Sequence, residues 1–213
     1  MKIENYKHII WDWNGTIMND VDLSVALING LLVTRGLEAL SVASYRDVFT
    51  IPVKNYYSKL GFDFSKESFE IVGKEWVDGY ERRKFECGLY DGAKNVLLKI
   101  NNMGIGQSIL SAYSQHTLEE MVEFYGLTKY FTHIVGLDNI YAASKLHLGK
   151  DLMKRLGNGK GETLLIGDTE HDHEVAVEIG ADCVLIANGH QSKDKLEKLG
   201  CAVYPNLNSL LGR

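Results

Sequence analysis

The sequence is poor in proline and cysteine, and this scarcity argues against several classes of protein. Only two prolines occur in 213 residues, Pro52 and Pro205, so there is no Pro-rich linker or low-complexity segment. The three cysteines are scattered and form no CxxC pair, which argues against a structural zinc site or a disulfide framework. No stretch approaches the roughly 18 apolar residues of a membrane span. The apolar run near the start is too short for a signal peptide and contains Asp12. We therefore expect a globular protein of the reducing cytoplasm.

The sequence also lacks an excess of positive charge. Its 23 Lys and Arg residues stand against 28 Asp and Glu residues, which gives a net charge of −5. Such a chain has no overall attraction to nucleic acid or to an anionic membrane, so neither is expected as a partner. An anionic substrate would need local cations, supplied by Lys, Arg or a metal. The length allows one large domain or two modest ones, and the oligomeric state cannot be read from the composition.

The stretch HIIWDWNGTI, residues 8–17, organises the rest of the chain. Ile9, Ile10 and Trp11 form an apolar run that a turn sequence, Asn14-Gly15, closes, and this pattern predicts a buried strand. Asp12 falls where that strand should end. The carboxyl ends of strands in open α/β sheets are the edge at which ligands bind, so Asp12 is a candidate functional residue. The plainer interpretation is an Asp that caps a turn.

Residues 20–85 read as helix almost throughout. Apolar residues recur at helical spacing between Leu23 and Leu32, Ser44 and Ser65 are candidate N-caps, and Pro52 is well placed to begin a helix. A strand-free block of this size, directly after the strand that carries Asp12, predicts a helical insertion. The expected domains are therefore a core of residues 1–19 and 86–213 and an inserted helical domain of residues 20–85.

Strands and helices alternate in the remainder of the chain. Asp91 is a candidate cap for the first of these helices, which should end near Gly104. Strands are predicted at 105–110, 132–135, 163–166 and 183–186, the last of them taken as the final strand, with helices at 117–125, 145–156 and 174–179. Such alternation predicts an α/β fold with a parallel sheet of at least five strands and right-handed crossovers.

Polar residues follow four of the predicted strands. They are Asp12 with Asn14-Gly15-Thr16, then Ser111, then Lys145, then the run Gly167 to Asp172. Each is a weak signal alone, because a Ser after a strand is usually a turn residue and a Lys at a helix start is usually solvated. Their order and spacing along the chain are a much stronger signal.

In that order the features resemble the haloacid dehalogenase-like (HAD) hydrolase superfamily, mostly Mg-dependent phosphatases, and its phosphoglycolate-phosphatase-like branch. DWNGT at 12–16 matches the motif DxDGT, and SILS at 108–111 matches an apolar strand ending in Ser or Thr. Lys145 lies some two dozen residues before GDTEHD at 167–172, which matches GDxxxD. The resemblance covers the whole chain. It implies a Rossmann-like sheet of order 3-2-1-4-5, with the helical block as a cap that closes over the site between hinges near 18–20 and 85–89.

The resemblance also implies an activity: Mg²⁺-dependent hydrolysis of a small phosphomonoester through an aspartyl-phosphate. Asp12 would be the nucleophile. Ser111, the backbone N–H of Ala112, and Lys145 would contact the phosphate, and Thr16 would donate a hydrogen bond near the site. The Mg²⁺ ligands would be Asp12, the backbone carbonyl of Asn14, Asp168 and, directly or through a water, Asp172.

Asn14 departs from the family pattern. The phosphatases usually have Asp there as general acid and base, which contributes about 10²–10⁴-fold in rate, and a carboxamide cannot replace it. Three interpretations of Asn14 stay open. The enzyme is slow or suited to good leaving groups; another residue serves, with Glu170, His171 and His173 the nearest in sequence; or the protein binds phosphate and metal without catalysis.

Two assignments of lysines depend on the resemblance. A related branch of the superfamily cleaves carbon–phosphorus bonds without this Asp, but it needs a Schiff-base Lys from the cap, and Lys54 is the one cap lysine considered for that role. Lys150 competes with Lys145, although Lys145 fits the spacing better. No role is assigned to His8, His116, His133, His147 or His190, which are interpreted as surface or edge residues.

Overall fold

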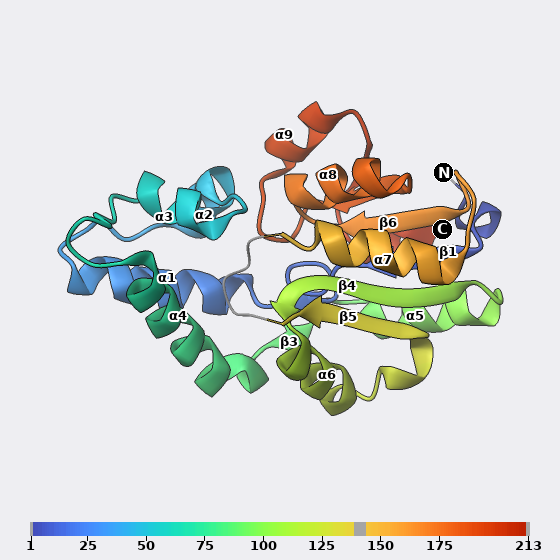
Figure 1. Cartoon of the computed structure of the whole chain (residues 1–213), viewed down its shortest axis with the longest axis horizontal. Helices are drawn as coiled ribbons and strands as arrows, with labels where there is room; N and C mark the ends of the chain where they lie inside the picture. Colours follow the sequence, from blue (N-terminus) through green and yellow to red (C-terminus); the bar gives the residue numbers. More distant parts are fainter. Residues whose placement is uncertain (1, 139–143, 212–213) are drawn as a thin grey trace.

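The computed structural model describes residues 2–138 and 144–211, and a six-stranded parallel sheet forms its centre (Figure 1). The sheet order is β5-β4-β1-β6-β7-β8. The strands are β1 (His8–Trp11), β4 (Gly106–Ser114), β5 (His133–Leu137), β6 (Thr163–Gly167), β7 (Asp182–Ile186) and β8 (Ala202–Tyr204). The predicted order 3-2-1-4-5 is confirmed, and β8 adds a sixth strand beside β7. The prediction that 183–186 is the final strand was therefore wrong.

Helices cover both faces of this sheet. On one face Ile9 and Trp11 of β1 share a hydrophobic cluster with α5 (Ala93–Asn102) and α6 (Gln115–Phe124). On the other face Ile10 packs with α7 (Leu146–Leu156) and α8 (Glu170–Ile179). Burial on both faces explains why β1 is apolar throughout instead of alternating. The short helices are α9 (Lys193–Leu196), η1 (Ile3–Asn5), η2 (Lys84–Glu86), η3 (Thr128–Tyr130), η4 (Glu197–Leu199) and η5 (Leu207–Leu211).

Residues 20–85, here called the helical segment, form a second hydrophobic cluster with its own aromatic side chains. Its helices are α1 (Val21–Thr34), α2 (Val42–Val48), α3 (Val53–Lys59) and α4 (Phe69–Arg83). They lie to one side of the sheet, beyond the carboxyl ends of its strands (Figure 1). The chain leaves the sheet through β2 (Met18–Asn19) and returns through β3 (Gly88–Leu89), which pair antiparallel.

Several predicted helix caps were wrong by a few residues. Ser41 caps α2, because its hydroxyl accepts the Ser44 N–H at 3.1 Å, and Ser68, not Ser65, caps α4. Gly92, not Asp91, precedes α5, with a left-handed φ of 82°. Helix α8 begins at Glu170, four residues earlier than predicted, because Thr169 and Asp172 form a capping box. Strand β4 also continues past residue 111 to residue 114.

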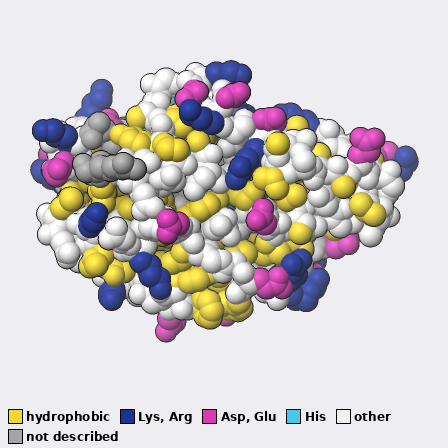
Figure 2. Space-filling view, turned by 180° about the vertical axis from the view of Figure 1, so that it is seen from behind, with side chains coloured by type: hydrophobic (Ala, Val, Ile, Leu, Met, Phe, Trp, Pro, Cys, Tyr) yellow, Lys and Arg dark blue, Asp and Glu magenta, His cyan; other side chains and the backbone are white. Residues whose placement is uncertain are grey.

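The surface fits the charge balance of the sequence. On the face in Figure 2, Lys and Arg side chains are interspersed with Asp and Glu, and no large area carries one sign. None of the helices in the described residues has the length and apolar character needed to span a membrane.

Candidate active site

Three carboxylates meet at the carboxyl end of the sheet. Asp12 follows β1 and Asp168 follows β6, and these strands pair in parallel with Trp11 opposite Ile166. Asp172 lies in the first turn of α8. Oxygen atoms of Asp12, Asp168 and Asp172 lie within 4.8 Å of one another, and all three side chains are buried. The parallel register thus unites residues that are 156 positions apart in sequence, Asp12 and Asp168.

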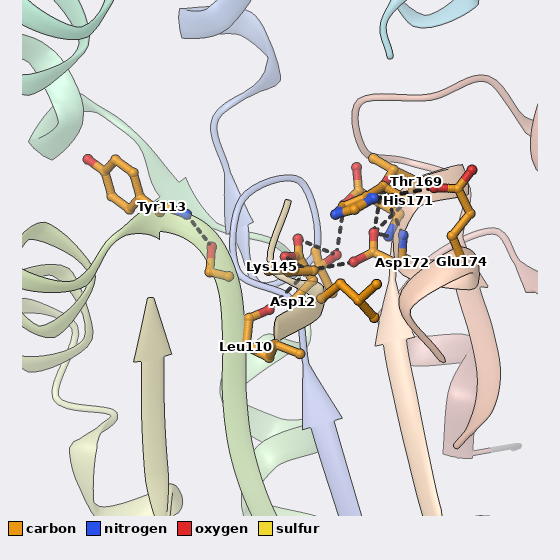
Figure 3. A network of polar contacts seen from close by, with 12 residues as sticks. Asp12, Leu110, Tyr113, Lys145, Thr169, His171, Asp172 and Glu174 are labelled. Carbon is orange, nitrogen blue, oxygen red and sulfur yellow. Dashed lines mark hydrogen bonds and ion pairs between the residues drawn. The ribbon is translucent and has the colours of Figure 1, made fainter. Parts of the chain in front are cut away.

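Lys145 joins this cluster from the residue before α7. Its Nζ donates to Asp12 Oδ1 and, at 2.9 Å, to the Leu110 carbonyl, and it lies 2.6 Å from Asp172 Oδ1 (Figure 3). Its side chain is only 2% exposed. Lys150 instead forms an exposed ion pair with Glu178 at 3.4 Å. Of the two candidate lysines, the structure brings Lys145 to the carboxylates.

The electrostatics of the cluster reflect burial and a surplus of negative charge. Burial raises the pKa of Asp12, with Lys145 opposing it and the other carboxylates adding to it. Burial also raises the pKa of Asp168, against the lowering effect of His190. At Asp172 burial is outweighed by Lys145, which brings the pKa below its usual range. Burial lowers the pKa of Lys145, but Asp12 and Asp172 raise it by more. Its pKa therefore lies above the usual range, and the ammonium stays charged.

These residues fit a divalent, oxygen-seeking cation such as Mg²⁺. Three buried carboxylates face one ammonium, so a cation among them would offset their mutual repulsion. The backbone also approaches Asp168 closely, since a Cβ at Gly15 or Gly189 would meet its carboxylate. Gly15 in addition has a φ of 75°, which other residues rarely adopt.

The other expected site residues surround this cluster. Thr16 Oγ1 donates to Asp168 Oδ1 at 2.9 Å, so it orients a carboxylate. Ser111 and Ala112 line the cavity beside Asp12, where the pairing of β4 with β5 shifts register. The Ser111 oxygen accepts the Tyr113 N–H at 3.1 Å, which leaves its own O–H available as a donor.

The side chain of Asn14 points to the helical segment. Its Nδ2 donates to Asp20 Oδ2 at 2.9 Å and to the Tyr80 hydroxyl at 2.8 Å. Tyr80 also donates to Asp20 Oδ2 at 2.8 Å, and the Gly15 N–H donates to Asp20 Oδ1 at 2.9 Å. Asn14 therefore links the loop after β1 to α1 and α4, a role that sequence reasoning missed.

His190 is the main residue that the sequence interpretation placed wrongly. It is buried, its backbone N–H donates to Asp168 Oδ2 at 2.6 Å, and its ring Nε2 lies 3.3 Å from Asp20 Oδ1. Burial lowers its pKa, but Asp20 outweighs this and raises the pKa to about 9. His190 follows β7 at the same sheet edge, which is the signal that could have found it. His8 is buried as well, 2.8 Å from Ser108 Oγ.

Of the three residues considered as a substitute for the general acid, only one lines the cavity among the described residues. His171 is buried and lines the cavity, and its Nε2 has no hydrogen-bond partner among the described residues. Glu170 and His173 are not among the lining residues, and Glu170 lies 3.6 Å from Lys195. Lys54 is exposed, outside the cavity, with Nζ 5.8 Å from the centre of the Phe64 ring, where it fits no Schiff-base role.

A cavity of about 150 Å³ separates the carboxylates from the helical segment. Asp12, Asp172 and Lys145 line one side of it, and side chains of α1 to α4 line the other. The fold and this site define a Rossmann-like α/β protein with an acidic site at the carboxyl edge of its sheet. The model of the haloacid dehalogenase-like hydrolase family matches residues 9–186, and the chain belongs to that family. No curated protein matches the sequence.

Solved structures share the fold at low sequence identity. A predicted phosphatase from Clostridium acetobutylicum superposes with a TM-score of 0.83 at 18% identity, over 97% of this chain and 96% of that one. A predicted phosphoglycolate phosphatase from Haemophilus somnus gives 0.77 at 15% identity, over 97% of each chain. Protein tyrosine kinase A of Mycobacterium tuberculosis gives 0.81 at 19% identity, over 99% of this chain and 100% of that one. Because these names span different activities, the likeness establishes the fold alone.

Proposed function

We propose that the protein is a Mg²⁺-dependent phosphohydrolase that acts on a small phosphomonoester through Asp12. The observation that carries the proposal is the position of Asp12, a buried carboxylate at the sheet edge that faces a partly enclosed cavity and is held by Lys145. The family to which the chain belongs supports hydrolysis. Structural neighbours described as phosphatases support a phosphate ester as substrate.

The proposed reaction has two displacements at phosphorus. A carboxylate oxygen of Asp12 attacks the phosphorus atom, the bond from phosphorus to the ester oxygen breaks, and the ester oxygen leaves with the bonding electrons and takes a proton from solvent. Water then attacks the phospho-aspartate, releases inorganic phosphate and restores Asp12. Lys145 supplies positive charge to the phosphoryl oxygens, while the Ser111 hydroxyl and the Ala112 N–H donate to them.

Asp12, Asp168, the backbone carbonyl of Asn14 and, directly or through a water, Asp172 would hold the Mg²⁺. Bound there, the ion would neutralise charge on the phosphoryl group. The Thr16 hydroxyl and the backbone N–H of His190 fix the orientation of Asp168, since each donates to one of its two oxygens.

Residues 20–85 act in this proposal as a cap over a core of residues 1–19 and 86–213. Tyr45 and Arg46 of α2 reach the core, because Tyr45 bonds His190 at 2.8 Å and Arg46 donates to the Asn188 and Gly189 carbonyls at 2.8 Å. Closure would exclude water from the phosphoryl group. The paired strands β2 and β3 are the connections at which it would hinge.

Asn14 favours a second candidate, a protein that binds metal and phosphate with little or no turnover. A carboxamide that donates to Asp20 and Tyr80 cannot protonate a leaving group. The two candidates differ in one measurement, the hydrolysis of p-nitrophenyl phosphate with Mg²⁺ and with a chelator.

The deciding variant is Asp12→Asn, with Asp151→Asn as the matched control. Asp151 is an exposed residue of α7 whose partner is Lys154, so its loss should not change hydrolysis. We expect wild type and Asp151→Asn to turn over the ester only with Mg²⁺, and Asp12→Asn to be inactive. If wild type, Asp151→Asn and Asp12→Asn all fail to hydrolyse the ester, and wild type still binds Mg²⁺ and phosphate, the protein is the binding protein instead.

A further inference from the structure

The wall of the cavity that faces the phosphoryl site is mostly aromatic and apolar, although Asp20 and Ser24 also line it. Phe49, Tyr56, Phe69 and Trp76 line it from the helical segment, and Tyr113 lines it from β4. No Lys, Arg or His of the helical segment is among the described lining residues. Because the phosphate would lie against Asp12 and Lys145, this wall must receive the part of the substrate that leaves.

The cations around the cavity are already engaged. Lys145 is shared between Asp12 and Asp172, and His190 faces Asp20. Two more cations lie where α2 meets the core. Arg46 donates to the Gly189 carbonyl and Lys195 donates to the Phe49 carbonyl, each at 2.8 Å. Residues 139–143, outside the described part, read NIYAA and contain no basic residue.

A second anionic group on the substrate would therefore be buried without a partner. Burying an unpaired carboxylate is costly. The carboxylate of phosphoglycolate or the second phosphate of a bisphosphate would pay that cost here. A sugar would gain few hydrogen bonds, since the accessible lining of the cavity is mostly apolar.

A fully buried polar atom of this wall lacks a hydrogen-bond partner among the described residues. The Tyr56 side chain is 2% exposed, and its hydroxyl makes no hydrogen bond among the described residues. The ring is held by edge contacts to Tyr45 and Phe49, with centroids 5.8 and 5.3 Å away. Buried hydroxyls are nearly always paired, so we take the unpaired Tyr56 hydroxyl, on a residue that lines the cavity, as a group that a ligand would satisfy once the ring turns it toward the cavity.

We propose that the leaving group is an uncharged aromatic ring whose polar substituent pairs with the Tyr56 hydroxyl, so that the substrate is an aryl phosphate. This inference rests on the proposed function. The cavity of about 150 Å³ must also hold the phosphoryl group, so it has room for a leaving group no larger than a single ring. Aromatic walls favour edge and offset contacts with such a ring. The phosphorus–oxygen bond breaks with departure of a phenolate, which needs no proton from Asn14 and takes one from solvent.

The test measures binding with phosphonates, which cannot be hydrolysed, by calorimetry on the full chain with Mg²⁺. Benzylphosphonate carries the ring, and 3-phosphonopropionate carries a carboxylate in its place. We expect benzylphosphonate to bind more tightly, on the order of tenfold or more, because the ring is removed from water. 4-Hydroxybenzylphosphonate should bind more tightly still. Equal or tighter binding of 3-phosphonopropionate would overturn the proposal, even if the protein hydrolyses p-nitrophenyl phosphate.

Two variants locate the ring. Tyr56→Phe should remove the advantage of the 4-hydroxy ligand and leave benzylphosphonate binding unchanged, whereas Tyr204→Phe, on the distant strand β8, should change neither. Ile51→Arg places a cation at a half-buried lining position and should shift preference toward 3-phosphonopropionate. A hydroxyl advantage that survives in folded Tyr56→Phe, or an unshifted preference in Ile51→Arg, would count against the site. Selective binding of benzylphosphonate without hydrolysis of any aryl phosphate would support the aromatic site and refute the phosphohydrolase.

Discussion

Replacing Asn14 by aspartate would restore the usual acid of the family, and the structure predicts two opposite effects. A positioned acid contributes about 10²–10⁴-fold, and for alkyl phosphates we expect a smaller gain, roughly 10-fold or more. Against this, the new side chain loses the donors that reach Asp20 at 2.9 Å and Tyr80 at 2.8 Å. A second carboxylate would then face buried Asp20.

The size of the structural cost follows from these contacts. A hydrogen bond to a charged group contributes about 1.5–3 kcal/mol. Like charges also raise one another's pKa, so one of the two carboxyls should take up a proton and donate to the other again. We therefore expect the free energy of unfolding to fall by about 1–3 kcal/mol in Asn14→Asp. The exchange variant Asn14→Asp/Asp20→Asn keeps one carboxylate and one carboxamide across the same contact and should recover most of the loss.

The assay compares kcat/KM for a matched aryl and alkyl phosphate in wild type, Asn14→Asp and the exchange variant, with urea unfolding of each. Wild type should prefer the aryl ester strongly, and both variants should gain chiefly on the alkyl ester. Peptide mass analysis must accompany the assay, because Asn-Gly sequences deamidate to aspartate. If fresh wild type hydrolyses both esters at similar high rates and Asn14→Asp changes neither, the reasoning is refuted, and His171 becomes the next residue to mutate.

Asp12→Asn should abolish turnover with little change in thermal midpoint, and retained activity would remove Asp12 as nucleophile. Mg²⁺ at 100 times its Kd should stabilise the fold by about 2.7 kcal/mol, and Asp168→Asn should abolish this gain in a melting assay. Burial, with His133 adding, lowers the pKa of His8 to about 4, below the unfolded value of about 6.5. The unfolded chain therefore binds more protons, so stability should fall as pH drops from 6.5 to 4. His8→Gln should show a smaller fall in urea unfolding; an equal fall would contradict the assignment.

The sequence by itself determined the sheet and the place of the site along the chain. Apolar runs that close in turn residues encode buried parallel strands locally, and the residues that follow such runs must lie at one edge of the sheet. Asp12 and Asp168 could be named in this way because each stands in a short motif next to its strand, whereas Lys145 was named from its spacing before the second motif, by resemblance to the family. Strand β8 was not predicted, because its three residues AVY are too few for a periodic pattern. Only its pairing with β7 defines it.

Only the tertiary structure decided how the site is surrounded. Lys145 caps α7 and Lys150 lies within it, so the two lysines are close in sequence. Only the structure shows that Lys145 is the one that reaches Asp12. The contact of Asn14 with Asp20 and Tyr80, and that of His190 with Asp20, join segments that no local pattern connects. The aromatic wall of the cavity likewise arises from packing of the helical segment against the sheet edge. Local sequence fixes periodicity and turns, whereas partners distant in the chain are chosen by packing, because burial forces each polar group to find a partner wherever the fold places one.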